Sequence, residues 1–279
     1  MKFFAGLSLD RPRIMGIVNA TPDSFSDGGE AFQVEDAVNR GLQMISDGAD
    51  IIDVGGESTR PGASPVGIDQ EIQRIVPIIE RLSQQGALVS VDTRHALVMQ
   101  AALDAGAKII NDVSALTGAG ALDVVAKSKA DVVLMHMQGL PATMQDHPSY
   151  LNAATQVFDY LKERVAVCNQ ASIESNRIAV DPGIGFGKTV KDNLQILARL
   201  KDYDELGFPV LIGVSRKSFI GAITDEPNAK NRVAGSLASA LWSVQQGAAI
   251  LRVHDVVETN QALKVWVAIN ETTNEATDT

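Results

Sequence analysis

The segment 53–62 is a group of residues that could clamp an anionic ligand. It supplies two hydrogen-bonding side chains, Asp53 and Thr59, a guanidinium from Arg60 and a rigid edge at Pro61. A guanidinium beside hydroxyl and carboxylate groups can organise the binding of a phosphate or a carboxylate. The alternative for a charged, glycine-containing stretch is a solvated turn. Two isoleucines just before the segment predict a strand that opens into this loop.

Further segments of the chain also gather polar and charged side chains that could bind an anion. Asn19 begins a long polar loop that contains one aromatic residue, Phe25, and such a loop can act as a lid. Ser218 begins a helical pattern directly after Arg216 and Lys217, so a helix N-terminus beside fixed cations could hold a carboxylate or phosphate. The alternative there is an ordinary N-cap. The basic residues gathered in these segments are Arg60, Arg216, Lys217 and Arg252.

Residues 182–189 imitate the phosphate-binding pattern G-x-x-x-x-G-K-[ST], in which Lys188 would be the phosphate-binding lysine. Pro182 stands where the first glycine belongs. The segment also follows the sixth of eight apolar runs and lacks the context of a nucleotide-binding fold, so we do not expect ATP to bind.

The histidines do not form a protein-built zinc site. His95, His136, His147 and His254 lack the spacing of zinc ligands, and the chain has one cysteine. A Mg²⁺ ion carried by a diphosphate and contacted by one or two side-chain oxygens fits better.

The elements that must position these residues are eight short apolar runs separated by segments of helical spacing. The runs begin near Ile14, Ile51, Leu88, Ile109, Val132, Ile178, Val210 and Ile250. Alternating strands and helices fit either a doubly wound sheet or a closed barrel, and eight units in about 250 residues favour the barrel. We therefore predict an α/β fold, a single (β/α)8 TIM-barrel domain over residues 1–270. A short strand or hairpin should precede it, and residues 271–279 should form a polar, disordered tail.

Each apolar run ends in polar or charged residues, while the starts of the runs show no comparable set. The residues at the ends are Asn19, Asp53, Asp92, Asn111, His136, Asp181, Ser215-Arg216-Lys217-Ser218, and Arg252 with His254. Barrel active sites are built at this end of the strands, although any one of these residues could be a turn or cap residue.

Composition and net charge limit the classes of partner that we expect for the chain. A net charge of −10 argues against a general nucleic-acid or anionic-membrane surface. No stretch approaches the ~20 apolar residues of a membrane span. Cys168 lies in a helical apolar pattern, which predicts a buried thiol, and a single cysteine fits a cytoplasmic protein.

Five of these segments together resemble the bacterial dihydropteroate synthases, the folate-pathway enzymes inhibited by sulfonamides. They are NATPDSFSDGG at 19–29, DVGGESTRPG at 53–62, DPGIGFGK at 181–188, SRKS at 215–218 and RVHD at 252–255. The resemblance runs from about Ile14 to His254 and beyond. One mild departure is Ala20, where many relatives carry valine.

The resemblance implies a reaction and a set of site residues. The family joins 6-hydroxymethyl-7,8-dihydropterin diphosphate to 4-aminobenzoate, which gives 7,8-dihydropteroate and diphosphate, and it commonly forms homodimers. The pterin would contact Asp92, Asn111, Asp181, Lys217 and Arg252. The diphosphate would contact Asn19, Thr59, Arg60, Arg252, Val253 and His254, with Asn19 also the Mg²⁺ contact. The 4-aminobenzoate would contact Phe25, Thr59, Pro61, Phe186, Lys217 and Ser218.

The chemistry of this reaction explains the lack of a strong general base. An arylamine is neutral at pH 7 and already nucleophilic, so departure of diphosphate is the step that needs assistance. Cations and Mg²⁺ can stabilise the leaving group, and Asp92 and Asp181 can stabilise positive charge on the pterin methylene. We therefore predict an SN1-like substitution with Asp92, Asp181, Lys217 and Arg252 as the catalytic residues.

Two other functions share parts of this pattern. Methyltetrahydrofolate-dependent methyltransferases have the same fold and bind pterin with carboxylates, but they need no diphosphate clamp. A catalytically silent paralogue would bind pterin without forming product, and damage in the first two loops would be its signature. Here Phe25, Thr59, Arg60 and Pro61 are all in place.

Overall fold

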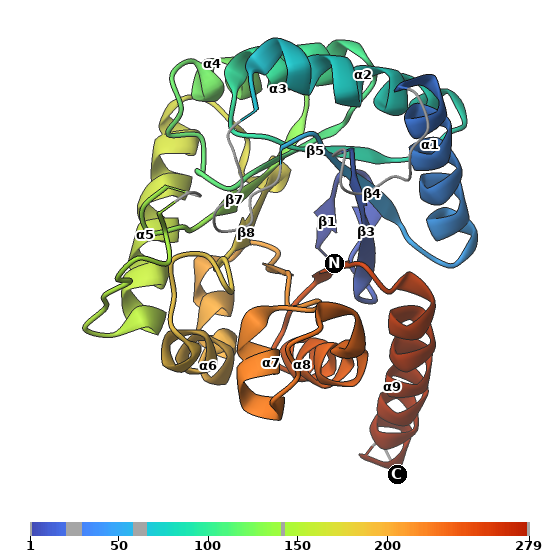
Figure 1. Ribbon diagram of the computed structural model, residues 1–279. Helices are drawn as coiled ribbons and strands as arrows, with labels where there is room; N and C mark the ends of the chain where they lie inside the picture. The colour runs from blue at the N-terminus through green and yellow to red at the C-terminus, as the bar shows by residue number, and fades with distance from the viewer. Residues whose placement is uncertain (1, 21–29, 58–65, 141–142, 278–279) are drawn as a thin grey trace.

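Eight parallel strands form a barrel at the centre of the molecule (Figure 1). The computed structural model describes residues 2–20, 30–57, 66–140 and 143–277. The barrel strands are β3 (Arg13–Asn19), β4 (Ile51–Gly55), β5 (Val89–Asp92), β6 (Ile109–Asp112), β7 (Asp131–Met135), β8 (Ile178–Asp181), β9 (Leu211–Ile212) and β10 (Ile250–Val253). β10 pairs with β3, and a parallel bridge between Val180 and Val210 joins β8 to β9. The predicted TIM barrel is confirmed, with one strand for each apolar run.

Helices cover the outside of the barrel (Figure 1). They are α1 (Glu30–Ser46), α2 (Ile68–Gln84), α3 (Ala96–Asp104), α4 (Ala121–Lys127), α5 (Ala153–Gln170), α6 (Val190–Ala198), α7 (Ser218–Thr224), α8 (Val233–Gln245) and α9 (Val256–Thr277). α7 is a short extra helix before α8, and it begins at Ser218 as the sequence predicts. The expected buried thiol, Cys168, lies on the buried face of α5. In the described part of the chain, no helix has both the length and the apolar character needed to cross a membrane.

Two apolar layers hold the barrel together because side chains alternate between the two faces of each strand. The outward layer packs against the helices and includes Val54, Val91 and Ile110. The inward layer at the N-terminal end of the strands contains Met15, Ile51, Ile109, Val133, Ala179, Leu211 and Ile250. The barrel interior is therefore filled at this end and is not a channel.

An antiparallel hairpin closes the N-terminal end of the barrel. Its strands are β1 (Phe3–Phe4) and β2 (Leu7–Ser8), which confirms the short hairpin expected before the barrel. Phe4 joins the inward apolar layer and is 1% exposed, whereas its neighbour Phe3 is 55% exposed. The hairpin therefore inserts one aromatic ring as a plug beneath the strands.

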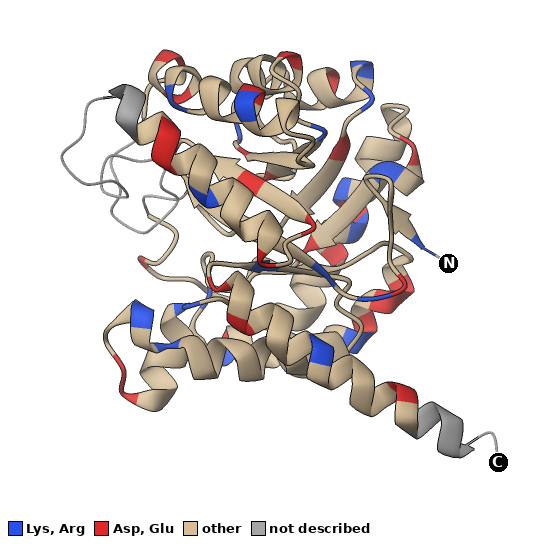
Figure 2. Ribbon diagram, turned by 90° about the vertical axis from the view of Figure 1, so that its right-hand side faces the viewer, with Lys and Arg blue, Asp and Glu red and all other residues tan. Residues whose placement is uncertain are grey.

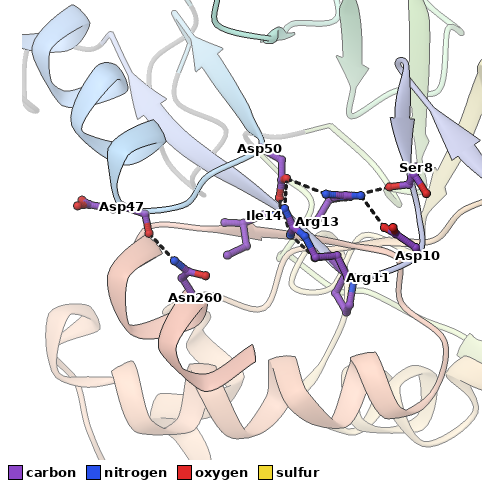
Figure 3. A network of polar contacts seen from close by, with 9 residues as sticks. Ser8, Asp10, Arg11, Arg13, Ile14, Asp47, Asp50 and Asn260 are labelled. Atoms are coloured by element: carbon purple, nitrogen blue, oxygen red, sulfur yellow. Dashed lines mark hydrogen bonds and ion pairs between the residues drawn. The ribbon is translucent and has the colours of Figure 1, made fainter. Parts of the chain in front are cut away.

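The N-terminal end of the barrel also carries charged residues, contrary to the expectation that it has no comparable polar set. Arg13 and Arg11 both bind the carboxylate of Asp50, and Arg13 also binds Asp10 (Figure 3). The Asp50 carboxylate accepts the backbone N–H of Ile14 at 2.9 Å as well. These acidic and basic side chains are paired with each other. They therefore stabilise the start of β3 and do not form a patch of like charge.

The last helix differs from the prediction for the C-terminal end. α9 continues through residues 271–277, within the segment expected to be a disordered tail. Local bonds support the helix here: Asn270 donates to the Trp266 carbonyl and Thr272 donates to the Ala268 carbonyl.

On the side of the molecule in Figure 2, acidic and basic residues are interspersed along the helices.

Candidate active site

Strand alternation directs the predicted site residues into the mouth of the barrel. Counting in steps of two from the inward layer, Ile51 leads to Asp53, Ile109 leads to Asn111, and Ile250 leads to Arg252. The same step leads from Ala179 to Asp181, and two such steps lead from Met15 to Asn19. The strand register sets Asp92 directly beside Asn111. The barrel interior is thus apolar at its N-terminal end and polar at its C-terminal end.

Arg252 is the centre of a buried ionic cluster in this mouth. Its Nε atom lies 2.6 Å from Oδ2 of Asp53, and its Nη2 atom lies 2.6 Å from Oδ2 of Asp92. Asn111 donates to the same Asp53 oxygen at 3.1 Å. One guanidinium edge is therefore held between two carboxylates, which fixes its plane.

The position of Asp53 differs from the one that the sequence predicts. The sequence predicts that Asp53 begins the loop 53–62, but β4 continues through Gly55, and the Asp53 side chain is fully buried. Its Oδ1 atom finds no hydrogen-bond partner among the described residues. The residue therefore lies in the wall of the site and not in the anion-binding loop, and it was assigned to neither substrate from the sequence. The step of two from Ile51 was the signal that could have located it.

Burial and neighbouring charges shift the ionisation of the cluster. Burial raises the pKa of Asp92 to about 7, and Arg252 opposes this increase. Burial also raises the pKa of Asp181, against the hydrogen bond from the Gly183 N–H. Burial alone would weaken the charge on Arg252, yet Asp53 and Asp92 hold the pKa of its guanidinium above the usual value. The mouth therefore holds a permanent cation beside a carboxyl group that titrates near neutrality.

Lys217 and Phe186 form a second part of the site. The Lys217 Nζ atom lies 4.1 Å from the centroid of the Phe186 ring. Burial lowers the pKa of Lys217 to about 8, with Arg252 lowering it further and Asp181 raising it. The ring and the ammonium are in direct contact, and together they offer a flat surface against which a rigid aromatic ligand could pack.

His254 stands beside Arg252 and contacts the Ser215 hydroxyl through Nδ1. The Ser215 Oγ atom lies 3.0 Å from Nδ1 of His254 and accepts the His254 backbone N–H at 3.1 Å. Burial lowers the pKa of His254 to about 3, with Arg252 and Arg216 adding to the effect. A neutral ring whose Nδ1 accepts from Ser215 carries its proton on Nε2, which is then available to donate to an anionic oxygen.

Not every predicted residue joins this group. Phe25, Thr59, Arg60 and Pro61 lie outside the described residues. The Val253 side chain is buried in the outward apolar layer, so any contact with diphosphate would have to come from its main chain. Ser218 is the first residue of α7, and the N-cap of this helix is Lys217.

His136 and Lys188 lie together behind the site. Lys188 Nζ is 3.0 Å from Nδ1 of His136, and both side chains are buried. The lysine of the phosphate-loop-like segment is therefore turned into the protein.

The side chains at the barrel mouth can be compared with the ligands that the expected Mg²⁺ ion would need. Among the described residues, no three His, Cys, Asp or Glu side chains are grouped as a metal site would need. Asn19, the last residue of β3, is half-buried at the barrel mouth and offers one hard amide oxygen. This donor fits a Mg²⁺ ion whose other ligands come from a bound diphosphate and water.

Comparisons with known proteins agree with this geometry. The family model of pterin-binding enzymes matches residues 15–254. Dihydropteroate synthase from Neisseria meningitidis serogroup B is 49% identical over 269 residues, which are 94% of each chain. The structure of Xanthomonas albilineans dihydropteroate synthase with 4-aminobenzoic acid is 51% identical, with a TM-score of 0.90 over 95% of this chain and 96% of that chain. The same organism's enzyme in complex with 7,8-dihydropteroate is 46% identical, with a TM-score of 0.85 and the same coverage.

Proposed function

The chain belongs to the pterin-binding enzymes, and from this premise we propose how its barrel mouth binds and joins two substrates. It is a transferase that forms dihydropteroate in folate biosynthesis. The substrates are 6-hydroxymethyl-7,8-dihydropterin diphosphate and 4-aminobenzoate, and diphosphate is released. The observation that carries the residue assignments is the Arg252 guanidinium held between the carboxylates of Asp53 and Asp92.

The pterin occupies the deepest part of the mouth. Its guanidine-like edge presents N–H donors, which Asp92, Asp181 and the Asn111 amide can accept. Lys217 supplies a donor for the pterin carbonyl edge, and the guanidinium of Arg252 lies against the pterin face. Burial of Asp181 and Asn111, which are 5% and 3% exposed, supports a dry pocket for a flat heterocycle.

The diphosphate binds nearer the solvent. Arg252 and the Nε2–H of His254 face it, with the main chain of Val253 beside them. Asn19 would contribute its amide oxygen to an accompanying Mg²⁺. Thr59 and Arg60, which lie outside the described residues, are assigned to the anion site from the family resemblance. When bound, Mg²⁺ supplies positive charge that stabilises the departing diphosphate.

The 4-aminobenzoate lies against the Phe186 ring and the stem of Lys217. The Lys217 Nζ atom contacts this ring at 4.1 Å from its centroid, so the ligand ring lies beside the pair and not between its members. Phe25, Thr59 and Pro61, which lie outside the described residues, are assigned to the same ligand from the family resemblance. The carboxylate binds at Ser218 and the backbone N–H groups that begin α7.

The reaction is an SN1-like substitution. The bond between the pterin methylene carbon and the diphosphate oxygen breaks, and its electron pair leaves with diphosphate. The aryl nitrogen then donates its lone pair to the methylene carbon and loses one proton to solvent. Asp92 and Asp181 stabilise the methylene cation, while Arg252 and Lys217 hold the pterin in place.

The experiment that tests this function follows both products together. Diphosphate release from the pterin diphosphate is measured with Mg²⁺, with and without 4-aminobenzoate, while dihydropteroate is detected by mass. Formation of dihydropteroate only when both substrates are present is expected. Tight binding of pterin diphosphate without product would instead identify a silent paralogue.

We also propose that the enzyme is a cytoplasmic homodimer. One buried free cysteine fits a reducing compartment. Large apolar side chains on the outer helices support association, since Trp242 on α8 and Val265 on α9 are 50% and 58% exposed.

A further inference from the structure

Lys188 lies at the centre of the loop that joins β8 to α6, and the reaction does not use it. Its side chain is only 3% exposed. The Nζ atom is 2.9 Å from the carbonyl oxygens of both Gly183 and Phe186, and it is 3.0 Å from Nδ1 of His136. A fourth acceptor, the His136 carbonyl, lies 3.3 Å away. The lysine head is therefore enclosed by acceptors that belong to two adjacent loops.

The number of acceptors indicates the charge state of this group. An ammonium has three N–H donors, which match the three shortest contacts when Nδ1 of His136 is an acceptor. A neutral amine would satisfy the same contacts only if His136 carried its proton on Nδ1. Burial lowers the pKa of Lys188 to about 7, and the Asp181 carboxylate opposes this change. Hydrogen bonds to carbonyl oxygens favour the charged form as well. A cage of backbone carbonyls is also how proteins coordinate a dehydrated potassium ion.

The backbone of the loop is shaped to form this cage. Gly183 has φ of +67°, and a Cβ atom there would lie 2.0 Å from the His136 carbonyl oxygen. Gly187 has φ of +58°, and its Cβ would lie 2.4 Å from the Gln138 carbonyl oxygen. Because both positions need glycine, the loop can lie directly against the segment that follows β7. The Tyr150 hydroxyl fastens the end of the loop by donating to the Gly187 carbonyl at 2.7 Å.

Both backbone polar groups of Phe186, the N–H and the carbonyl, are hydrogen-bonded within this loop. Its N–H donates to the Gly183 carbonyl at 3.1 Å, and its carbonyl accepts from Lys188. Its ring is the one that lies beneath the Lys217 ammonium. The position of the aromatic slot therefore depends on a buried cation that does not enter the slot.

We propose that Lys188 is a positioning residue, an internal cation around which residues 182–188 fold, and that it sets the place of Phe186 in the 4-aminobenzoate slot. The proposal rests on the function proposed above. It predicts that loss of the Lys188 charge affects binding of 4-aminobenzoate more than binding of the pterin diphosphate, because Asp92 and Asn111 are held by strands and the backbone of Asp181 is fixed in β8.

The first test removes the charge and keeps the length of the side chain. In Lys188→Met the buried carbonyls lose their donor, so we expect the KM for 4-aminobenzoate to rise roughly tenfold to a hundredfold. The dissociation constant of pterin diphosphate should change by no more than about threefold. Lys191→Met, at an exposed position on α6, is the matched control and should behave as the wild type. An unchanged KM, or an equal loss of both affinities, would overturn the proposal.

A double-mutant cycle tests whether Lys188 acts through Phe186. Phe186→Leu alone should raise the KM for 4-aminobenzoate, and adding Lys188→Met should raise it little further, because both changes damage the same slot. Fully additive effects would show that Lys188 acts by another route.

Chemical rescue distinguishes an internal cation from a general structural role. Lys188→Ala leaves space at the cage, so added ammonium or potassium chloride should lower its KM for 4-aminobenzoate toward the wild-type value. Choline chloride at equal ionic strength should not do so, and the wild type should not respond. Absence of rescue by either cation would contradict the proposal. If the wild type itself forms no dihydropteroate, the proposed function fails instead.

If the Lys188 variants do not fold, the unmodified protein still decides the question. With ¹⁵N-labelled lysine, the Lys188 Nζ signal should be that of a slowly exchanging ammonium, coupled through hydrogen bonds to the carbonyl carbons of Gly183 and Phe186. A neutral amine, or an ammonium that exchanges freely with solvent, would overturn the proposal.

Discussion

Asp53 binds Arg252 with one carboxylate oxygen, while its other oxygen has no partner among the described residues. Asp53→Asn keeps the shape but removes the charge that holds the guanidinium. A hydrogen bond to a charged group contributes about 1.5–3 kcal/mol, so we expect kcat/KM for pterin diphosphate to fall roughly tenfold or more. Asp123→Asn, at an exposed position on α4, is the control. A change of less than about twofold would mean that Asp53 does not orient Arg252.

Asp92 and Asp181 are the carboxylates assigned to the methylene cation. Asp92→Asn and Asp181→Asn should each lower kcat roughly 10²-fold or more, because an amide cannot supply the negative charge. Single-turnover formation of dihydropteroate measures this step without product release. Near-normal turnover in both variants would exclude the SN1-like substitution.

The dependence of kcat/KM on pH follows from Asp92 and Lys217. The raised pKa of Asp92, about 7, means that its carboxylate forms only as pH rises through that value. The lowered pKa of Lys217, about 8, means that its ammonium is lost above that value. A bell-shaped profile with its maximum between the two is expected, and Asp92→Asn should remove the acidic limb. A flat profile between pH 6 and 9 in the wild type, each limit being about one unit from a pKa, would contradict these assignments.

As pH rises, the contribution of Asp92 to stability should fall while its contribution to activity increases. The pKa of this group is raised in the folded chain from 3.8, so the folded state favours the protonated form. Its contribution to stability is therefore greatest at low pH and is lost as pH rises from about 4 to about 7.

Among the elements, the β1–β2 hairpin provides a matched pair of positions. Phe4 plugs the barrel and Phe3 faces solvent. Phe4→Ala removes a buried ring and should lower the free energy of unfolding by about 3–5 kcal/mol, whereas Phe3→Ala should change it little. Urea denaturation of both variants measures the difference. Equal effects would show that the hairpin does not act as a plug.

The elements were predictable from the sequence because strand and helix periodicity depends on burial, which the apolar residues record. All eight apolar runs became barrel strands. Asp53 was misplaced because a polar residue after two isoleucines resembles the end of a strand, whereas the barrel interior is polar at its mouth. The direction of Lys188 was not predictable either, since it depends on positive φ angles at Gly183 and Gly187. The ion pairs of Arg252 join residues that are far apart in the chain, so no local pattern encodes them.

At the scale of the whole molecule, association of the outer helices can be tested directly. A homodimer should sediment with about twice the chain mass of 29.7 kDa. Val265→Glu places a charge on the exposed apolar face of α9 and should shift the equilibrium toward monomer. Leu97→Glu, at an exposed leucine on α3, is the control and should remain dimeric. A wild-type chain that sediments as a monomer would rule out the homodimer.

Closure of the barrel between its first and last strands has a consequence for biosynthesis. Arg13–Gly16 pairs with Ile250–Val253, so the edge of β3 stays open until nearly the whole chain has left the ribosome. Until then, the apolar layer around Phe4 is incomplete and exposed to other nascent chains. We therefore expect that chains stalled before residue 250 bind chaperones and are cut readily by proteases. Emergence of β10 should abolish both properties together, since it completes the ring.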